Sequence, residues 1–223
     1  MTRSSRREFL GLAGAAAAAA ALASCQLQGR RPTAKVPKSG PLALGVIGVG
    51  GRGWDNLHGV APGETIAALC DVDASHLATA GAEFPQAAQF RDYHEMLAKV
   101  PLDAVVISTP DHTHAPATIA ALRAGLDVYC EKPLTHTIAE AREITAAASW
   151  HRAVTQMGTQ IHAGDNYRRV VELIRAGAIG EVKEAHCWVG KAWGGGDRPT
   201  DKPPVPPELD WKLWLGTAPA RPY

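Results

Sequence analysis

Residues 48–53 are the part of the sequence whose types and spacing point most directly to chemistry. They read Gly-Val-Gly-Gly-Arg-Gly, with Gly48, Gly50 and Gly53 in the G-x-G-x-x-G pattern of dinucleotide-binding turns. The first glycine allows a tight turn, the second lets a diphosphate approach the backbone, and the third lets the next helix pack against the preceding strand. The free N–H groups at the start of that helix would face the phosphates. The pattern therefore predicts a diphosphate site.

Asp71 is the second residue with a chemical role, because it lies 18 residues beyond Gly53 at the end of an apolar run. A carboxylate near this distance accepts hydrogen bonds from the ribose hydroxyls of NAD. The same charge repels the 2′-phosphate of NADP, so we expect NAD, with NADP still possible because Arg52 could accept the extra phosphate. The alternative is that Asp71 caps a turn or helix, a role that Asp73 could fill equally well.

The segments around these residues alternate between short apolar runs and helical stretches. The expected strands are 42–47, 65–70, 87–90, 103–108, 126–130 and 153–157. The expected helices are 52–60, 92–99, 114–124 and 137–151. Apolar strands that alternate with helices are typical of a parallel sheet covered on both faces. We therefore predict the α/β class, with a Rossmann-type doubly wound parallel sheet that binds NAD(P) over residues 42–160.

Two further motifs complete a resemblance to a known family. Residues 108–114, Ser-Thr-Pro-Asp-His-Thr-His, follow the fourth expected strand, and Glu131-Lys132-Pro133 follows the fifth. Together with the glycine turn and Asp71, they resemble the Gfo/Idh/MocA oxidoreductase family. Similarity to exported members of this family continues through residues 157–160, 179–182 and 210–216.

The resemblance implies a role for Lys132. Its ammonium group would lie buried beside the nicotinamide and the substrate hydroxyl, where it would stabilise a developing alkoxide. The alternative is an exposed lysine in a loop. The other residues that the resemblance places at the cofactor are Thr109, Pro110, His114 and Glu131, with a cis bond before Pro133.

Other histidines and the cysteines offer weaker signals. His112 and His114 form a His-x-His pair, but a zinc site needs further ligands and none follows at motif spacing, so we expect no metal. Gln160 and His162 are candidates for the substrate pocket, with an exposed surface position as the alternative for His162. The cysteines show neither metal spacing nor a disulfide framework; they are Cys25, Cys70, Cys130 and Cys187.

Residues 1–24 are expected to be an export signal rather than part of the fold. Arg6 and Arg7 precede an apolar run from Leu10 to Ala23, which resembles a twin-arginine signal; an alanine-rich surface helix is the alternative. Leu-Ala-Ser-Cys at 22–25 resembles a lipobox, which would anchor the protein to a membrane through Cys25. Simple cleavage after Ala23 would instead leave a periplasmic protein. Residues 25–41 read as a tether.

Residues 161–223 are expected to begin a second, α+β domain for substrate binding and oligomerisation. It would contain a helix at 165–176, a strand at 182–189 and a turn at 211–215. A single strand leaves its backbone groups unpaired at both edges. We therefore expect a truncated domain, a catalytic histidine beyond residue 223, and a homo-oligomer when the protein is full length.

Composition and the resemblance together limit the function. The chain has 223 residues and a formal net charge of +1, which argues against a nucleic-acid partner. The leading hypothesis is an oxidoreductase that moves hydride between a nicotinamide cofactor and a sugar or cyclitol. The alternatives are a glycoside hydrolase that oxidises its substrate transiently with NAD, and a non-catalytic sensor of sugar or nucleotide.

Overall fold

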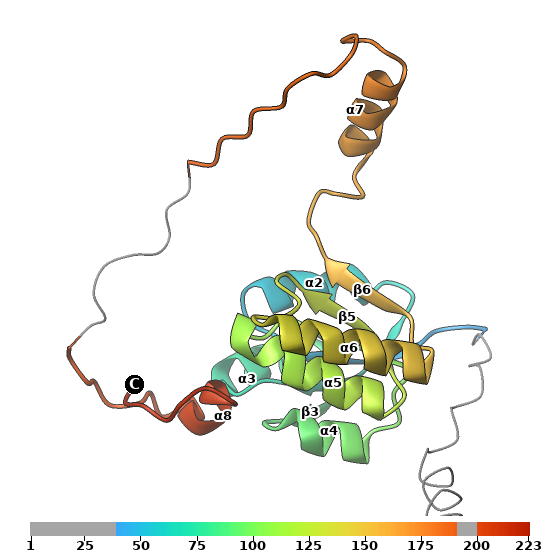
Figure 1. Ribbon diagram of the computed structural model, residues 1–223. Helices are drawn as coiled ribbons and strands as arrows, with labels where there is room; N and C mark the ends of the chain where they lie inside the picture. Colours follow the sequence, from blue (N-terminus) through green and yellow to red (C-terminus); the bar gives the residue numbers. More distant parts are fainter. Residues whose placement is uncertain (1–38, 191–199) are drawn as a thin grey trace, which may run out of the picture. The chain divides into compact units, whose positions relative to one another are not determined.

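A parallel sheet forms the centre of the structure, a computed structural model that describes residues 39–190 and 200–223 (Figure 1). The six strands have the order β3-β2-β1-β4-β5-β6, and each neighbouring pair is parallel. Their bounds are β1 Ala43–Ile47, β2 Thr65–Cys70, β3 Ala88–Phe90, β4 Ala104–Ile107, β5 Asp127–Glu131 and β6 Thr155–Gly158. The order reverses between β1 and β4, as in doubly wound dinucleotide-binding folds. The predicted fold class is confirmed.

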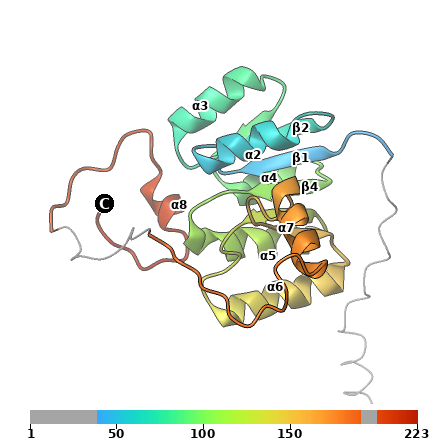
Figure 2. The same ribbon diagram turned by 90° about the horizontal axis from the view of Figure 1, so that it is seen from above.

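Helices cover both faces of the sheet, as Figures 1 and 2 show. One face carries α2 (Arg52–Val60) and α3 (Ala74–Glu83), and the other carries α4 (Tyr93–Lys99), α5 (His114–Arg123) and α6 (Ile138–His151). Neighbouring residues of one strand enter the two separate cores, because side chains alternate across a sheet. Burial on both faces explains why the strands read as continuous apolar runs.

Side chains that cap the helices fix where several of them begin. Asp73 accepts hydrogen bonds from the backbone at the start of α3, and Asp92 does the same for α4. Thr137 and Glu140 form a capping box at the start of α6. A short 3-10 turn, η1 (Asp111–Thr113), leads into α5. The bounds of α4, α5 and α6 are therefore close to those expected, whereas α3 was not among the predicted helices.

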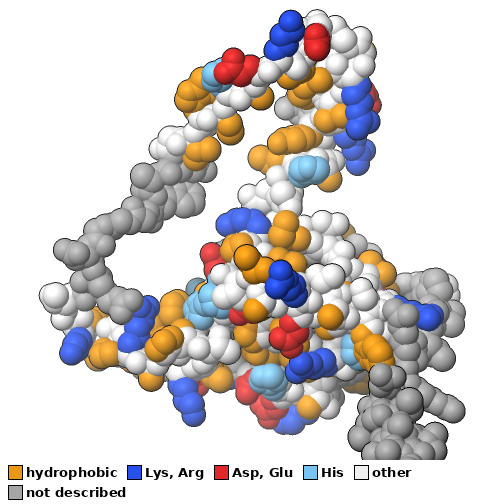
Figure 3. All heavy atoms as spheres, viewed as in Figure 1, with side chains coloured by type: hydrophobic (Ala, Val, Ile, Leu, Met, Phe, Trp, Pro, Cys, Tyr) orange, Lys and Arg blue, Asp and Glu red, His pale blue; other side chains and the backbone are white. Residues whose placement is uncertain are grey.

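The region after β6 differs from the expectation. Helix α7 (Asp165–Arg175) lies where a helix was expected, but the turn expected at 211–215 is a short helix, α8 (Trp211–Leu215). Residues 182–189 form no strand, so that prediction was wrong. Strands require a neighbour to pair their N–H and C=O groups, and none of the described strands pairs with this segment. Apolar side chains of α7 and of residues 179–189 are exposed, as Figure 3 shows for this face of the molecule.

The expected export signal, the lipobox cysteine Cys25 and most of the tether lie outside the described residues. Across residues 39–190 and 200–223, no helix is both long and apolar enough to cross a bilayer.

Candidate nucleotide-binding site

The turn between β1 and α2 has a geometry that requires glycine. Gly48 has a φ of 82°, and a Cβ there would lie 2.7 Å from the carbonyl oxygen of Ser108. A Cβ on Gly53 would lie 2.0 Å from the carbonyl oxygen of Gly48. Both collisions would be with backbone, which cannot give way. This geometry fits the roles predicted for Gly48 in a tight turn and for Gly53 in the close packing of α2.

Asp71 lies at the carboxyl end of β2, beside this turn. Its Oδ2 accepts a 2.8 Å hydrogen bond from the backbone N–H of Val49, and its Oδ1 accepts one of 2.9 Å from Asp73. The residue is only 9% exposed. Asp73, not Asp71, caps the helix that follows. Because each carboxylate oxygen has two lone pairs, Asp71 can still accept bonds from a ligand.

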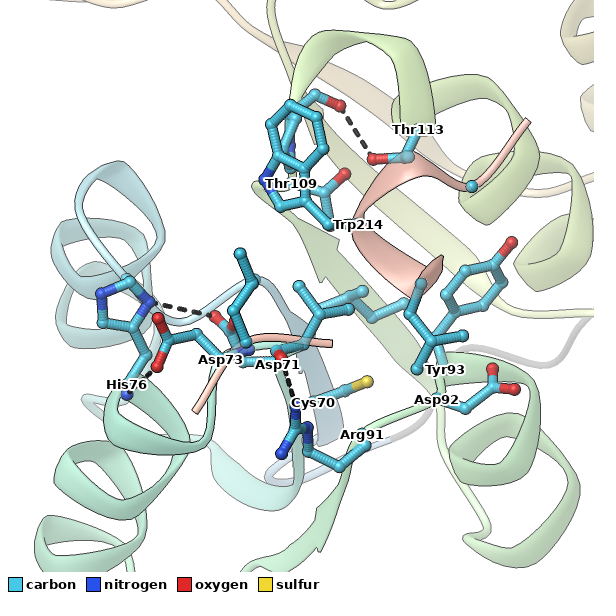
Figure 4. A pocket seen from close by; sticks show the side chains of 18 of the residues that line it. Cys70, Asp71, Asp73, His76, Arg91, Asp92, Tyr93, Thr109, Thr113 and Trp214 are labelled. Atoms are coloured by element: carbon cyan, nitrogen blue, oxygen red, sulfur yellow. Dashed lines mark hydrogen bonds and ion pairs between the residues drawn. The ribbon is translucent and has the colours of Figure 1, made fainter. Parts of the chain in front are cut away.

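A cavity of about 920 Å³ joins the turn and Asp71 at the carboxyl ends of β1, β2 and β4. Figure 4 shows Asp71, Asp73 and His76 toward one side of it, with Thr109 and Trp214 lying across from them. The volume is in the range of about 300–1,000 Å³ found for ligand pockets. Crevices at the reversal point of such sheets are where ligands bind in open α/β folds.

Two features of the cavity bear on nucleotide binding. The hydroxyl of Thr109 is buried and lacks a hydrogen-bond partner among the described residues, so it can bond to a ligand. Gly50 also lines the cavity, and a Cβ there would lie 2.4 Å from Nδ1 of His76. The absence of a Cβ at Gly50 therefore lets the His76 imidazole lie against the turn at the edge of the cavity. His76 Nδ1 lies 3.9 Å from Asp71 Oδ2, which places an imidazole at the same site.

Glu131 lies at the end of β5 and links this strand to α2. Its Oε1 accepts hydrogen bonds from Asn56 at 3.0 Å, from Tyr129 at 3.2 Å and from Arg52 at 3.5 Å. Burial alone would raise the pKa of Glu131. These hydrogen bonds and the Arg52 charge outweigh burial, and they hold the pKa below its ordinary value. The residue is 4% exposed and does not line the cavity, so its contacts are those of a buried link between elements.

Lys132 differs from the expectation in one respect. It directly follows β5, and the bond to Pro133 is cis, as the resemblance implied. Its side chain is exposed rather than buried, because none of the described residues covers it. Lys132 also does not line the cavity that contains Asp71. The predicted burial is therefore wrong for the described part of the chain, while the position at the carboxyl end of a sheet strand is as expected.

The two histidines of the His-x-His pair are held by backbone carbonyls. Both ring nitrogens of His114 lie 2.7 Å from carbonyl oxygens, those of Thr109 and Pro133. The ring thus ties the loop after β4 to the loop after β5. His112 Nε2 lies 2.8 Å from the carbonyl oxygen of Trp214. Among the described residues, no three side chains gather that could hold a metal ion.

Of the other predicted site residues, Arg52, Gln160 and His162 lie apart from the cavity, whereas Pro110 lines it. Arg52 contacts Glu131 and Asp55, and the side-chain amide of Gln160 lies beside its guanidinium group. With the amide oxygen turned toward Arg52, it would accept from Nε at 2.8 Å. Arg52 does not line the cavity, so the guanidinium is not placed to accept a 2′-phosphate there. His162 is exposed and stacks on Tyr167 at 5.3 Å. Pro110 lines the cavity together with Thr109.

Several residues of the site were not predicted. They are Asn56, His76, Arg91, Tyr129 and Trp214. Asn56 lies one turn after Gly53 on α2, and its amide reaches both Ser108 and Glu131. A polar residue in the first turns of this helix is the only sequence signal that could have indicated it. The other contacts join residues that are distant in sequence.

The fold and the site define a class. These are proteins with a doubly wound dinucleotide-binding domain, in which the glycine turn and an acidic residue at the end of β2 meet at the reversal of the sheet. Residues 42–159 match the family model described as "Oxidoreductase family, NAD-binding Rossmann fold". The chain therefore belongs to the Gfo/Idh/MocA family.

Several similar proteins are named inositol dehydrogenases. An inositol 2-dehydrogenase of Rubrobacter xylanophilus is 34% identical over 143 residues, which are 62% of this chain and 41% of that protein. The myo-inositol 2-dehydrogenase of Lactobacillus plantarum superposes with a TM-score of 0.61 at 29% identity, covering 64% of this chain and 43% of that one. A scyllo-inositol dehydrogenase of Lactobacillus casei was solved with bound NAD(H) and scyllo-inositol. It superposes with a TM-score of 0.59 at 26% identity, covering 63% of this chain and 43% of that one. The chain thus spans less than half the length of these relatives.

Proposed function

We propose that this protein is an NAD-dependent oxidoreductase that acts on a hydroxyl or carbonyl group of a cyclitol or sugar. The observation that carries the proposal is the hydrogen bond from the N–H of Val49 to Asp71. It joins the turn that would hold the diphosphate to the acid that would hold the ribose, and both line one cavity. The family description and the relative solved with NAD(H) support this cofactor. The names of the relatives support a cyclitol.

The residues that would hold NAD come from three loops at the carboxyl edge of the sheet. The backbone of the turn at 48–53 and the start of α2 would hold the diphosphate. Asp71 would accept the hydroxyls of the adenosine ribose, and the buried hydroxyl of Thr109 would supply a further hydrogen bond. A carboxylate at the ribose disfavours a 2′-phosphate, and Arg52 is directed to Glu131 instead, so we expect NAD over NADP.

Lys132 is the proposed catalytic residue. When bound, NAD supplies the acceptor or donor of hydride. The ammonium group of Lys132, at the end of β5, would hold a proton at the reacting substrate oxygen and so stabilise negative charge that develops there. Glu131 would position it, because its carboxylate anchors the end of β5 to α2.

A substrate panel tests the proposal. The full-length protein would be incubated with cyclitols, sugars and glycosides while the absorbance of the reduced nicotinamide and the released products are followed. We expect the nicotinamide of the bound NAD to be reduced when a cyclitol or sugar is added. Release of a sugar from a glycoside without net redox change would contradict the proposal and favour a hydrolase.

We also propose that the protein is exported in folded form with NAD as a resident group. The paired Arg6 and Arg7 before an apolar run support export by a twin-arginine route, which carries folded proteins. A nucleotide that stays bound for hours needs an off-rate of about 10⁻⁴ s⁻¹. With an on-rate of about 10⁶ M⁻¹s⁻¹, this corresponds to a Kd near 10⁻¹⁰ M. Native mass spectrometry of protein from the periplasm should show bound nucleotide; arrival without it would overturn this proposal.

A further inference from the structure

The segment 206–216, here named the C-terminal strap, returns to the nucleotide-binding domain and contacts the loop after β2. The N–H of Asp210 donates to the carbonyl oxygen of Val72 at 2.9 Å, and the N–H of Ala74 donates to that of Glu208 at 2.9 Å. Arg91 Nη2 donates to both carbonyl oxygens, at 2.5 and 3.0 Å. These bonds attach the strap to the loop that follows the ribose-binding acid.

The other end of the strap contacts the loop after β4. His112 Nε2 bonds to the carbonyl oxygen of Trp214, and the two rings lie 5.0 Å apart. Leu215 is 7% exposed, and a Cβ on Gly216 would lie 2.9 Å from Cγ2 of Thr113. The strap thus spans from β2 to β4 across the carboxyl end of β1, where the glycine turn lies.

This path makes the strap one wall of the cavity. Its lining side chains are mostly apolar: Leu209, Trp211, Lys212, Leu213 and Trp214. The domain side of the same cavity contains Gly50 and Asp71, but neither Glu131 nor Lys132 lines it. The cavity is therefore the part of the site that lies on the ribose-acid side, away from β5. Figure 4 shows the Trp214 indole beside Thr109, across from Asp71.

We infer that the strap is a component of the cofactor site and that Trp214 and Leu213 form the outer wall against the adenosine half of NAD. Large apolar and aromatic side chains suit a purine, which has an apolar face and little charge. Nucleotide that leaves the cavity on this side must first displace the strap, so the strap slows release. The inference rests on the proposed function and adds to it a set of binding residues outside the nucleotide-binding domain.

The test compares Trp214→Ala with Trp150→Ala in the full-length protein. Trp150 is an exposed tryptophan of α6 that does not line the cavity, so it controls for loss of an indole. Release of NADH, followed by its fluorescence, should be at least about tenfold faster in Trp214→Ala and unchanged in Trp150→Ala. In Trp214→Ala, calorimetry should show that the affinity for ADP-ribose falls by the same factor as the affinity for NAD. ADP-ribose keeps the adenosine and the diphosphate but lacks the nicotinamide.

The outcomes separate the inference from the proposed function. A wild-type protein that binds neither NAD nor NADP would contradict the proposed function. If the wild type binds NAD and folded Trp214→Ala retains both NAD and ADP-ribose equally well, the strap inference is wrong while the function stands. Should Trp214→Ala fail to fold, hydrogen exchange on the wild type decides. Saturating NAD should slow exchange at the amides of Ala74 and Asp210, and unchanged exchange at both would overturn the inference.

Discussion

The backbone N–H of Val49 donates a 2.8 Å hydrogen bond to the carboxylate of Asp71, across 22 residues of sequence. One partner belongs to the turn expected to hold a diphosphate, and the other is the acid expected to hold a ribose. The bond fixes the carboxylate at a set position relative to the turn before any nucleotide binds. Such preorganisation reduces the ordering cost of binding.

Replacing Asp71 should therefore weaken NAD binding directly. Asp71→Ala removes a charged acceptor for the ribose, an interaction of about 1.5–3 kcal/mol, so Kd for NAD should rise by about 10- to 100-fold. The preference for NAD over NADP should narrow as well, because the repulsion of a 2′-phosphate is lost. Calorimetric titration with both nucleotides measures this, with the exposed Asp201→Ala as control. An unchanged Kd for NAD would exclude Asp71 from the site.

The two glycines of α2 provide a matched pair. A Cβ on Gly53 collides with the carbonyl of Gly48, whereas one on Gly59 meets nothing within 4 Å. Gly53→Ala should distort the turn, lower the free energy of unfolding and abolish NAD binding. Gly59→Ala should raise the free energy of unfolding by about 0.5–1 kcal/mol and leave binding unchanged. Denaturation and NAD titration of both variants check this. Normal NAD binding by Gly53→Ala would show that the turn does not hold the diphosphate.

Lys132→Ala should separate chemistry from nucleotide binding. Loss of a positioned proton donor typically slows turnover by about 10²- to 10⁴-fold, while Lys132 lies outside the cavity that contains Asp71. We expect kcat to fall by that range and Kd for NAD to change less than about threefold. Lys99→Ala, an exposed lysine of α4 paired with Glu95, is the control and should behave as wild type. Turnover near the wild-type rate in Lys132→Ala would contradict the assigned role.

Glu131 gives a prediction about pH. The pKa of Glu131 in the folded protein is held below the ordinary glutamate value of about 4.3. The ionised carboxylate therefore stabilises the fold above that pH, and this contribution is lost as the pH falls through the lower folded-state pKa. Glu131→Gln should lower the free energy of unfolding by about 1–3 kcal/mol at pH 7, and the deficit should shrink below about pH 4.3. Urea unfolding at a series of pH values measures this. Glu143 is exposed, so the control variant Glu143→Gln should lose much less free energy of unfolding. A loss for Glu131→Gln that grows in acid would contradict a stabilising role for the ionised Glu131 carboxylate.

Local sequence was sufficient to predict most of the nucleotide-binding domain. Buried parallel strands read as apolar runs, and caps such as Asp92 and Thr137 mark where helices begin. The glycine turn and Asp71 were predictable because their spacing reflects a fixed geometry between β1, α2 and β2. These features depend on residues close in sequence.

The remaining features depend on long-range contacts. The strap could not be foreseen, because bonds such as that from Arg91 to Glu208 join residues 117 apart in sequence. The strand expected at 182–189 was wrong because a local stretch of sequence does not by itself supply a strand to pair with. The expected burial of Lys132 was wrong because burial depends on what covers a side chain, which spacing does not determine.

The most direct test of the account is a crystal structure of the full-length protein with NAD. The account predicts the adenosine ribose hydroxyls within hydrogen-bond distance of the Asp71 carboxylate and the diphosphate against the backbone at residues 48–53. A nucleotide bound elsewhere, or one whose diphosphate avoids that turn, would contradict it.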